Sequence, residues 1–138
     1  MSPTAEPPAV ADLVPQRGAM CLLDEITGRE AGGVTCAARV RPGCPLLVGG
    51  ALPAWALLEY VAQAAAALRG LEGGPVAGGA LAAIRDATLD PSPLSVGAAL
   101  EVQVRREGPA RGGLALLAGA VRAGGRTICT ARIVVSEG

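Results

Sequence analysis

Residues 49–70 read GGALPAWALLEYVAQAAAALRG, and this stretch decides the fold of the chain. Pro53 suits the first turn of a helix, and strong helix formers follow it as far as Arg69 and Gly70, a cation and a glycine that suit a helix end. We therefore predict a helix over residues 53–69. One face of it carries apolar side chains at helical spacing, those of Trp55, Leu58, Ala62, Ala65 and Leu68.

The other faces of this helix are almost as apolar. A helix that is apolar all round is buried on most sides, and at about 22 Å in length this one is too short to cross a bilayer. We therefore expect a core helix that other elements wrap. Two polar side chains interrupt it, Glu59 and, one turn later on the same side, Gln63.

Glu59 admits two interpretations, because a carboxylate in an apolar helix is costly unless a donor or a cation partners it. It either points to a solvated edge or is satisfied by a nearby donor, or it is a catalytic carboxylate of the kind that buried sites create. The residues alone leave both interpretations open.

The length and composition of the whole chain limit the functions that these residues can have. Its 138 residues fit one domain, 1–138, in which the proline-rich residues 1–11 form a flexible lead-in. A formal net charge of zero, with one Trp and one Tyr, argues against a nucleic-acid partner. The N-terminal segment lacks the pattern of a secretion signal, and we expect a cytoplasmic protein that does not enter a membrane.

The absence of histidine limits the chemistry most strongly. It excludes His-based acid–base catalysis within this chain and removes the commonest metal ligand. The cysteines form no Cys-x-x-Cys pair, so we expect neither a metal site nor a disulfide framework. They are Cys21, Cys36, Cys44 and Cys129.

The flanks of the helix read as strands. Before it, residues 19–30 have strand character, at Met20–Leu23 and Ile26, and a glycine hairpin joins them to a second strand predicted at Val34–Val40. After it, a glycine-rich stretch over 71–79 leads into period-two alternation. The strands predicted there cover 80–89, 100–105, 114–122 and 126–135. This order lacks βαβ alternation, so we predict an α+β fold in which an antiparallel sheet of about six strands wraps the helix.

Three segments carry a resemblance to a known family. VPQRGAMCLLD at 14–24 resembles the family's opening segment LPHR…MLLLD, LPAWALLEYVAQ at 52–63 resembles its helix motif, and LAAIRDA at 81–87 resembles its third strand. The chain thus resembles the hotdog fold and, within it, the 3-hydroxyacyl-(acyl carrier protein) dehydratases. It is most similar to the branch found in aryl polyene-type biosynthetic clusters.

This resemblance implies a substrate and a set of site residues. The substrate is a 3-hydroxyacyl group on the phosphopantetheine arm of an acyl carrier protein or of coenzyme A, and no cofactor is bound. Glu59 takes the place of the acid that protonates the leaving hydroxyl, while a His takes the α-proton. Backbone N–H groups at a helix N-terminus hold the thioester oxygen. The candidate substrate-binding residues are Gly49, Gly50, Ala54, Trp55, Gln63 and Cys44.

The chain departs from the family at the base. The family's His falls near Pro45, beside Cys44, and its opening PHR reads Pro15-Gln16-Arg17 here. An unperturbed thiol is a poor base at neutral pH. Because loss of a general base costs about 10² to 10⁴ in rate, we expect a homodimer of this chain to be a weak dehydratase or an inactive one.

Three functions remain open from the sequence. Hotdog chains pair their sheets edge to edge, with sites at the subunit boundary, so a different hotdog chain in a heterodimer could supply the His. Alternatively, Glu59 alone could activate water in an acyl thioesterase. The third possibility is a non-catalytic subunit or module that binds the acyl chain or its carrier protein.

Overall fold

The computed structural model describes residues 8–73 and 80–136. The first seven residues of the predicted lead-in and residues 74–79 of the glycine-rich stretch lie outside this part of the chain. The short turn that begins the described chain, η1 (Val10–Asp12), carries Val10 into the core.

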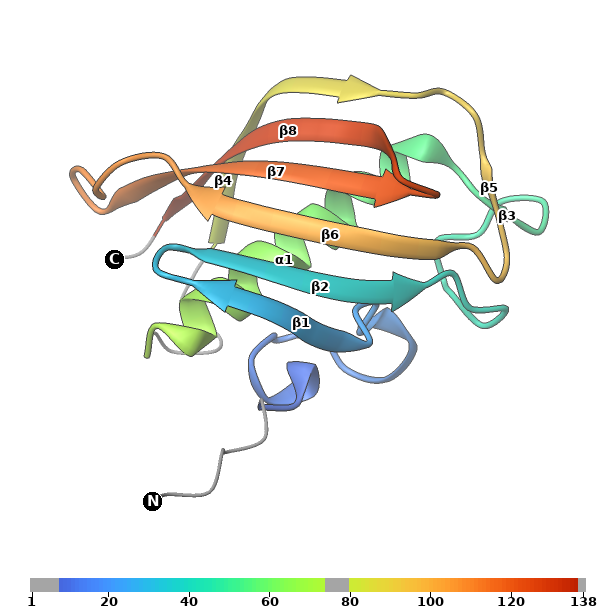
Figure 1. Ribbon diagram of the computed structural model, residues 1–138, viewed down its shortest axis with the longest axis horizontal. Helices are drawn as coiled ribbons and strands as arrows, with labels where there is room; N and C mark the ends of the chain where they lie inside the picture. Colours follow the sequence, from blue (N-terminus) through green and yellow to red (C-terminus); the bar gives the residue numbers. More distant parts are fainter. Residues whose placement is uncertain (1–7, 74–79, 137–138) are drawn as a thin grey trace.

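Six strands form one antiparallel sheet, in the order β1-β2-β6-β7-β8-β4 (Figure 1). The predicted alternation is visible in β6, where Val102 and Val104 are buried and Glu101 and Gln103 are exposed. The strands are β1 (Glu25–Glu30), β2 (Gly33–Arg39), β4 (Ala80–Leu89), β6 (Ala99–Arg106), β7 (Leu114–Ala123) and β8 (Arg126–Ser136). A separate pair, β3 (Ala51–Leu52) and β5 (Leu94–Ser95), was not predicted, because two residues are too few to show a period.

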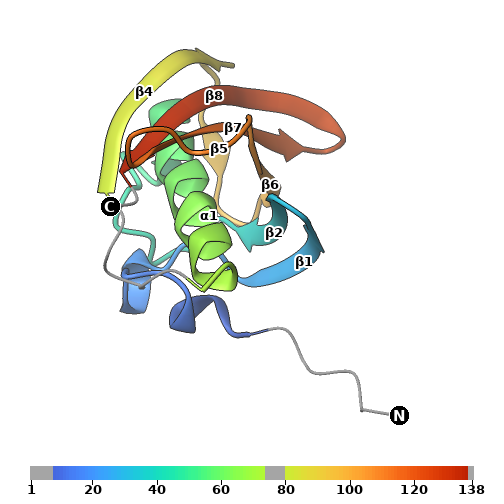
Figure 2. The same ribbon diagram turned by 90° about the vertical axis from the view of Figure 1, so that its left-hand side faces the viewer.

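The predicted core helix is α1 (Leu57–Leu71), and the sheet curves around it (Figure 2). It packs against β2, β6, β7 and β8. No residue of α1 is exposed, which confirms that a helix apolar on all sides must be wrapped. A long helix held against a curved antiparallel sheet is the hotdog arrangement, and the α+β prediction is confirmed.

The ends of the helix differ from the prediction. A 3₁₀ turn, η3 (Ala54–Ala56), precedes α1, and Gly70 continues the helix instead of ending it. A Cβ on Gly70 would lie 3.0 Å from the side chain of Leu13, so the glycine permits close packing. The predicted apolar face was also wrong at Trp55, which is 55% exposed, because the deepest face runs through Tyr60, Val61, Ala64 and Leu68.

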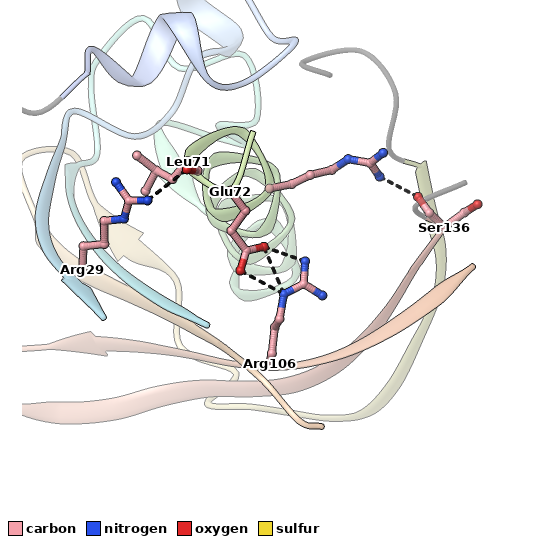
Figure 3. A network of polar contacts seen from close by, with 6 residues as sticks. Arg29, Leu71, Glu72, Arg106 and Ser136 are labelled. Carbon is pink, nitrogen blue, oxygen red and sulfur yellow. Dashed lines mark hydrogen bonds and ion pairs between the residues drawn. The ribbon is translucent and has the colours of Figure 1, made fainter. Parts of the chain in front are cut away.

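The C-terminal end of α1 is fixed to three strands of the sheet (Figure 3). Arg29 of β1 donates to the carbonyl of Leu71 at 2.9 Å, and Arg69 donates to the carbonyl of Ser136 in β8 at 2.8 Å. Arg106 of β6 forms a two-point ion pair with Glu72, with a shortest distance of 2.6 Å. These contacts fix the direction of the helix axis. They therefore help to position the first turn of the helix, which carries Glu59.

The strand predicted within residues 19–30 is present as β1, but its predicted start at Met20–Leu23 was wrong. A 3₁₀ turn, η2 (Gly18–Met20), is followed by extended backbone, and the sheet begins only at Glu25. Leu22 and Leu23 are buried as their apolar character requires, but the N–H of Leu22 donates to the side chain of Gln63. The backbone of this segment therefore bonds to the helix instead of to a neighbouring strand.

Candidate active site

The Glu59 carboxylate lies in the first turn of α1 and is half-buried. Two side-chain amides donate to its Oε1, Nε2 of Gln63 at 3.3 Å and Nε2 of Gln16 at 3.4 Å. Within the described residues, no donor reaches Oε2 and no cation forms an ion pair with Glu59. The helix N-terminus favours a negative charge at this position, and one oxygen remains available to a ligand.

This environment is unlike that of the other described carboxylates. Each of the others either forms an ion pair with an arginine or is exposed, so in residues 8–73 and 80–136 Glu59 alone is half-buried without an ion pair. The paired carboxylates are Asp24, Glu30, Glu72, Asp86, Asp90 and Glu107. Burial without a neutralising cation is typical of functional carboxylates.

Gln63 anchors the site to the N-terminal segment. Its side chain is 0% exposed, its Oε1 accepts from the N–H of Leu22 at 2.9 Å, and its Nε2 donates to the carbonyl of Met20 at 2.6 Å as well as to Glu59. Because the backbone partners are one donor and one acceptor, the orientation of this amide is fixed. Gln63 therefore satisfies buried backbone groups and contacts Glu59 at the same time.

Gln16 was missing from the candidate residues predicted from the sequence. It lies between η1 and η2, where Nη1 of Arg17 holds the loop by donating to the carbonyls of Val14, at 2.5 Å, and Gln16, at 3.0 Å. Its Oε1 is buried and has no hydrogen-bond partner among the described residues. The signal was present in the opening motif, whose His position Gln16 occupies, but 43 positions separate it from Glu59 in the chain.

Cys44 lies in the core beside the hydroxyl of Tyr60. Burial, and then the Cys44 thiol, raise the pKa of Tyr60 far above its ordinary value. Tyr60 follows Glu59 in the chain but is only 1% exposed. The structure therefore places Cys44 against Tyr60, with no hydrogen bond to Glu59.

The predicted oxyanion residues lie immediately before the helix. Gly49 and Gly50 form the tip of a two-residue turn with φ of +59° and +81°, closed by hydrogen bonds of 2.8 and 3.2 Å between the backbones of Val48 and Ala51. Ala54 and Trp55 begin the helical turn, and the first N–H groups of a helix have no intrahelical acceptor. Their service as an oxyanion cradle stays a prediction.

Hollows in the described chain include three that are lined by strands of the sheet. The one beside Glu101 and Arg122, of about 570 Å³, is larger than the other two, and Glu59 lines none of the three. The described residues hold no cluster of three or more His, Cys, Asp or Glu side chains suited to a metal ion. None of the helices in this part of the chain has the length and apolar character needed to cross a membrane.

Comparison with known proteins places this geometry in context. Residues 8–138 match the family model of ApeP-like proteins, described as ApeP dehydratase. Among solved structures, the chain is similar to the dehydratase heterocomplex ApeI:P from Xenorhabdus doucetiae, with a TM-score of 0.87 and 21% identity over 96% of this chain and 93% of that one. No match was found among curated protein sequences.

Two further structures are more distant. The PaaI protein of the Escherichia coli phenylacetic acid degradation operon has a TM-score of 0.66 and 14% identity, with 81% of each chain covered. A hypothetical thioesterase with coenzyme A from Streptococcus pneumoniae TIGR4 has a TM-score of 0.66 and 15% identity over 81% of this chain and 83% of that one. At these identities the structural likeness shows the shared fold alone.

Proposed function

Because this chain belongs to the ApeP-like dehydratase family, we propose that it is a dehydratase-type hotdog subunit that acts on 3-hydroxyacyl thioesters through the carboxyl group of Glu59. The observation that carries the proposal is the half-buried Glu59, held through one oxygen by Gln16 and Gln63 and lacking an ion pair within the described chain. A carboxyl group held in this way can give a proton to a leaving hydroxyl.

The reaction needs a base that this chain lacks. A base takes the proton from C2, the electron pair forms the C2=C3 double bond, and the C3–O bond breaks as the hydroxyl leaves with a proton from Glu59 as water. With no histidine in the sequence, we propose that a second hotdog chain supplies an imidazole as the base. The similarity to one component of a dehydratase heterocomplex supports this arrangement.

The free edge of β4 is the proposed contact with that partner. Among the described residues, β4 ends the sheet and pairs only with β8, and residues 83–88 are exposed (Figures 1 and 2). Ile84 on this strand is 40% exposed. A strand edge with unpaired backbone groups is a template for pairing with another chain.

The carrier of the substrate is proposed to be phosphopantetheine, on an acyl carrier protein or on coenzyme A. The chain's four cysteines are free thiols, which suits a reducing compartment such as the cytoplasm. Arg105 and Arg106 pair with Glu30 and Glu72, so these two cations do not form an unneutralised docking surface for an acidic carrier protein.

The test measures water loss from 3-hydroxyacyl thioesters on both carriers. The purified chain is expected to be slow alone and about 10² to 10⁴ faster with a hotdog partner that carries the base, and Glu59→Gln should lower the rate of the assembly by a similar factor. Glu25→Gln, at an exposed carboxylate, is the matched control. Full activity of a homodimer, or turnover that survives Glu59→Gln, would refute the proposal.

Thioester hydrolysis is the second candidate, favoured by the free Oε2 of Glu59. An ionised carboxylate with an unoccupied oxygen can take a proton from water, which then attacks the thioester, and this route needs no histidine. The two candidates differ in product. Dehydration gives an enoyl thioester, whereas hydrolysis gives a free acid and a thiol.

A further inference from the structure

Gln16 carries a buried polar atom that has no partner within the described chain. Its Oε1 is the one buried side-chain oxygen or nitrogen in residues 8–73 and 80–136 that lacks a hydrogen bond. Such atoms are rare in folded proteins because leaving a buried acceptor unpaired is costly. A donor from outside the chain would satisfy this one.

The orientation of this amide follows from Glu59. Its Nε2 lies 3.4 Å from Oε1 of Glu59, which also receives Nε2 of Gln63 at 3.3 Å. Turning the Gln16 amide over would bring two oxygens together. Since Oε1 and Nε2 belong to one amide, the free acceptor of Gln16 lies beside the Glu59 carboxyl group.

Two acceptors without donors in the described chain therefore belong to side chains that contact each other, Oε1 of Gln16 and Oε2 of Glu59. Oε1 of Gln16 can only accept a hydrogen bond, whereas Oε2 of Glu59 accepts when the group is ionised and donates when it is protonated. A hydroxyl group matches both residues when Glu59 is the acid, because its oxygen accepts from Glu59 while its hydrogen bonds to Gln16. A carbonyl or a methylene group has no hydrogen to donate to Gln16.

We propose that Oε1 of Gln16 accepts a hydrogen bond from the hydroxyl group on C3 of the acyl ligand, which makes Gln16 a specificity-determining residue. This inference rests on the proposed function, which supplies the acyl thioester, and adds the group that distinguishes 3-hydroxyacyl from saturated and 3-oxoacyl chains. The preference should be about tenfold in affinity, the size of one net hydrogen bond.

The experiment measures equilibrium affinities of the purified protein for coenzyme A thioesters of one chain length. The ligands are the two 3-hydroxyacyl enantiomers, the 3-oxoacyl thioester and the saturated thioester. The enantiomers are the sharpest pair, because they are equally apolar and differ only in where the hydroxyl points. The native protein should prefer one enantiomer, and Gln16→Met, which keeps the length of the side chain, should reduce that preference about tenfold without weakening the saturated ligand.

A stability measurement separates this role from a structural one. Gln16→Met removes an unpartnered acceptor together with one long hydrogen bond to Glu59, at 3.4 Å, so the denaturation midpoint of the unliganded protein should change little. A fall larger than that of Gln103→Met, at an exposed glutamine of β6, would assign Gln16 to folding and overturn the inference. A native protein that binds all four ligands equally, or a preference that is as large in Gln16→Met as in the native protein, would also overturn it and leave the proposed function intact. Failure of every thioester to bind would reject both.

Discussion

Gln63 links the candidate acid to the N-terminal segment through a single side-chain amide. It has no exposed surface, and its partners are the N–H of Leu22, the carbonyl of Met20 and the carboxylate of Glu59. The segment that carries Gln16 is therefore bonded to the same side chain that orients Glu59. The hydrogen bonds of Gln63 therefore hold the N-terminal segment in place and orient the candidate acid at the same time.

Replacing Gln63 with Met should destabilise the protein by about 2–6 kcal/mol, because it leaves two backbone groups unpaired at about 1–3 kcal/mol each. Urea denaturation measures this loss. Gln103→Met on the exposed face of β6 is the matched control and should stay within about 0.5 kcal/mol of the native protein. If both variants lose equally little, other contacts hold the segment in place.

Position 16 also provides a test of the missing base. Gln16→His places an imidazole where an amide now contacts Glu59, so one ring N–H can keep the hydrogen bond to the carboxylate while the other nitrogen can accept a proton. The dehydration rate of the chain without a partner should rise by about 10-fold or more, toward the 10² to 10⁴ that a general base contributes. Pro45→His, in the exposed loop beside Cys44, should give a smaller gain in rate. A larger gain from Pro45→His than from Gln16→His would show that the base belongs at position 45.

At the scale of elements, Gly119 of β7 allows the helix and the sheet to approach each other closely. A Cβ at this position would lie 2.4 Å from Cγ1 of Val61, closer than real Cβ atoms approach another atom. The contact sets the distance between α1 and the inner face of the sheet, and so the depth at which the helix lies.

Gly119→Ala should therefore destabilise the protein by about 1–3 kcal/mol through overpacking. Adding Val61→Ala should restore part of the loss, which a double-mutant cycle measures as a coupling energy. Gly28→Ala is the control within a strand, since its Cβ would lie 3.5 Å from Thr35 in ordinary contact. Additive effects of Gly119→Ala and Val61→Ala would contradict this account of the interface.

Local patterns predicted the elements whose own side chains decide their structure. The alternation of Val102 and Val104 located β6, and the apolar faces of residues 57–71 predicted a wrapped helix. The predictions were wrong where a residue far away in the sequence determines the local backbone structure. Gly70 continues the helix because Leu13 packs against it, and Leu22 leaves the strand pattern because Gln63, 41 positions away, takes its N–H.

The same limit applied to the candidate site. Glu59 stood out as a carboxylate in an apolar helix, and Gln63 followed from helical spacing alone. Gln16 was recognised only as a departure from the opening motif, since no local pattern shows that residue 16 reaches residue 59. Cys44 was placed near the base by its loop position, whereas the fold turns its thiol toward Tyr60.

For the whole molecule, two buried thiols make stability depend on alkaline pH. Cys36 of β2 and Cys129 of β8 are 0% and 1% exposed, and burial raises the pKa of each thiol from 9.0 to about 11. The folded state therefore keeps protons that the unfolded state gives up between these values. Because the folded state binds more protons in this range, stability falls as pH rises through it.

The free energy of unfolding should be constant near pH 8 and fall by about 2 kcal/mol per thiol by pH 11, from about 1.4 kcal/mol per pKa unit. The sequence contains no lysine, so the thiols and the single tyrosine dominate the titration in this window. Tyr60, whose pKa burial also raises, adds in the same direction above pH 10. Urea denaturation across this range checks the slope, and the double variant Cys36→Ala, Cys129→Ala should flatten it. A native protein whose stability is level between pH 9 and pH 11 would mean that water reaches these thiols, and hence that the sheet does not close over the helix as tightly as the structure shows.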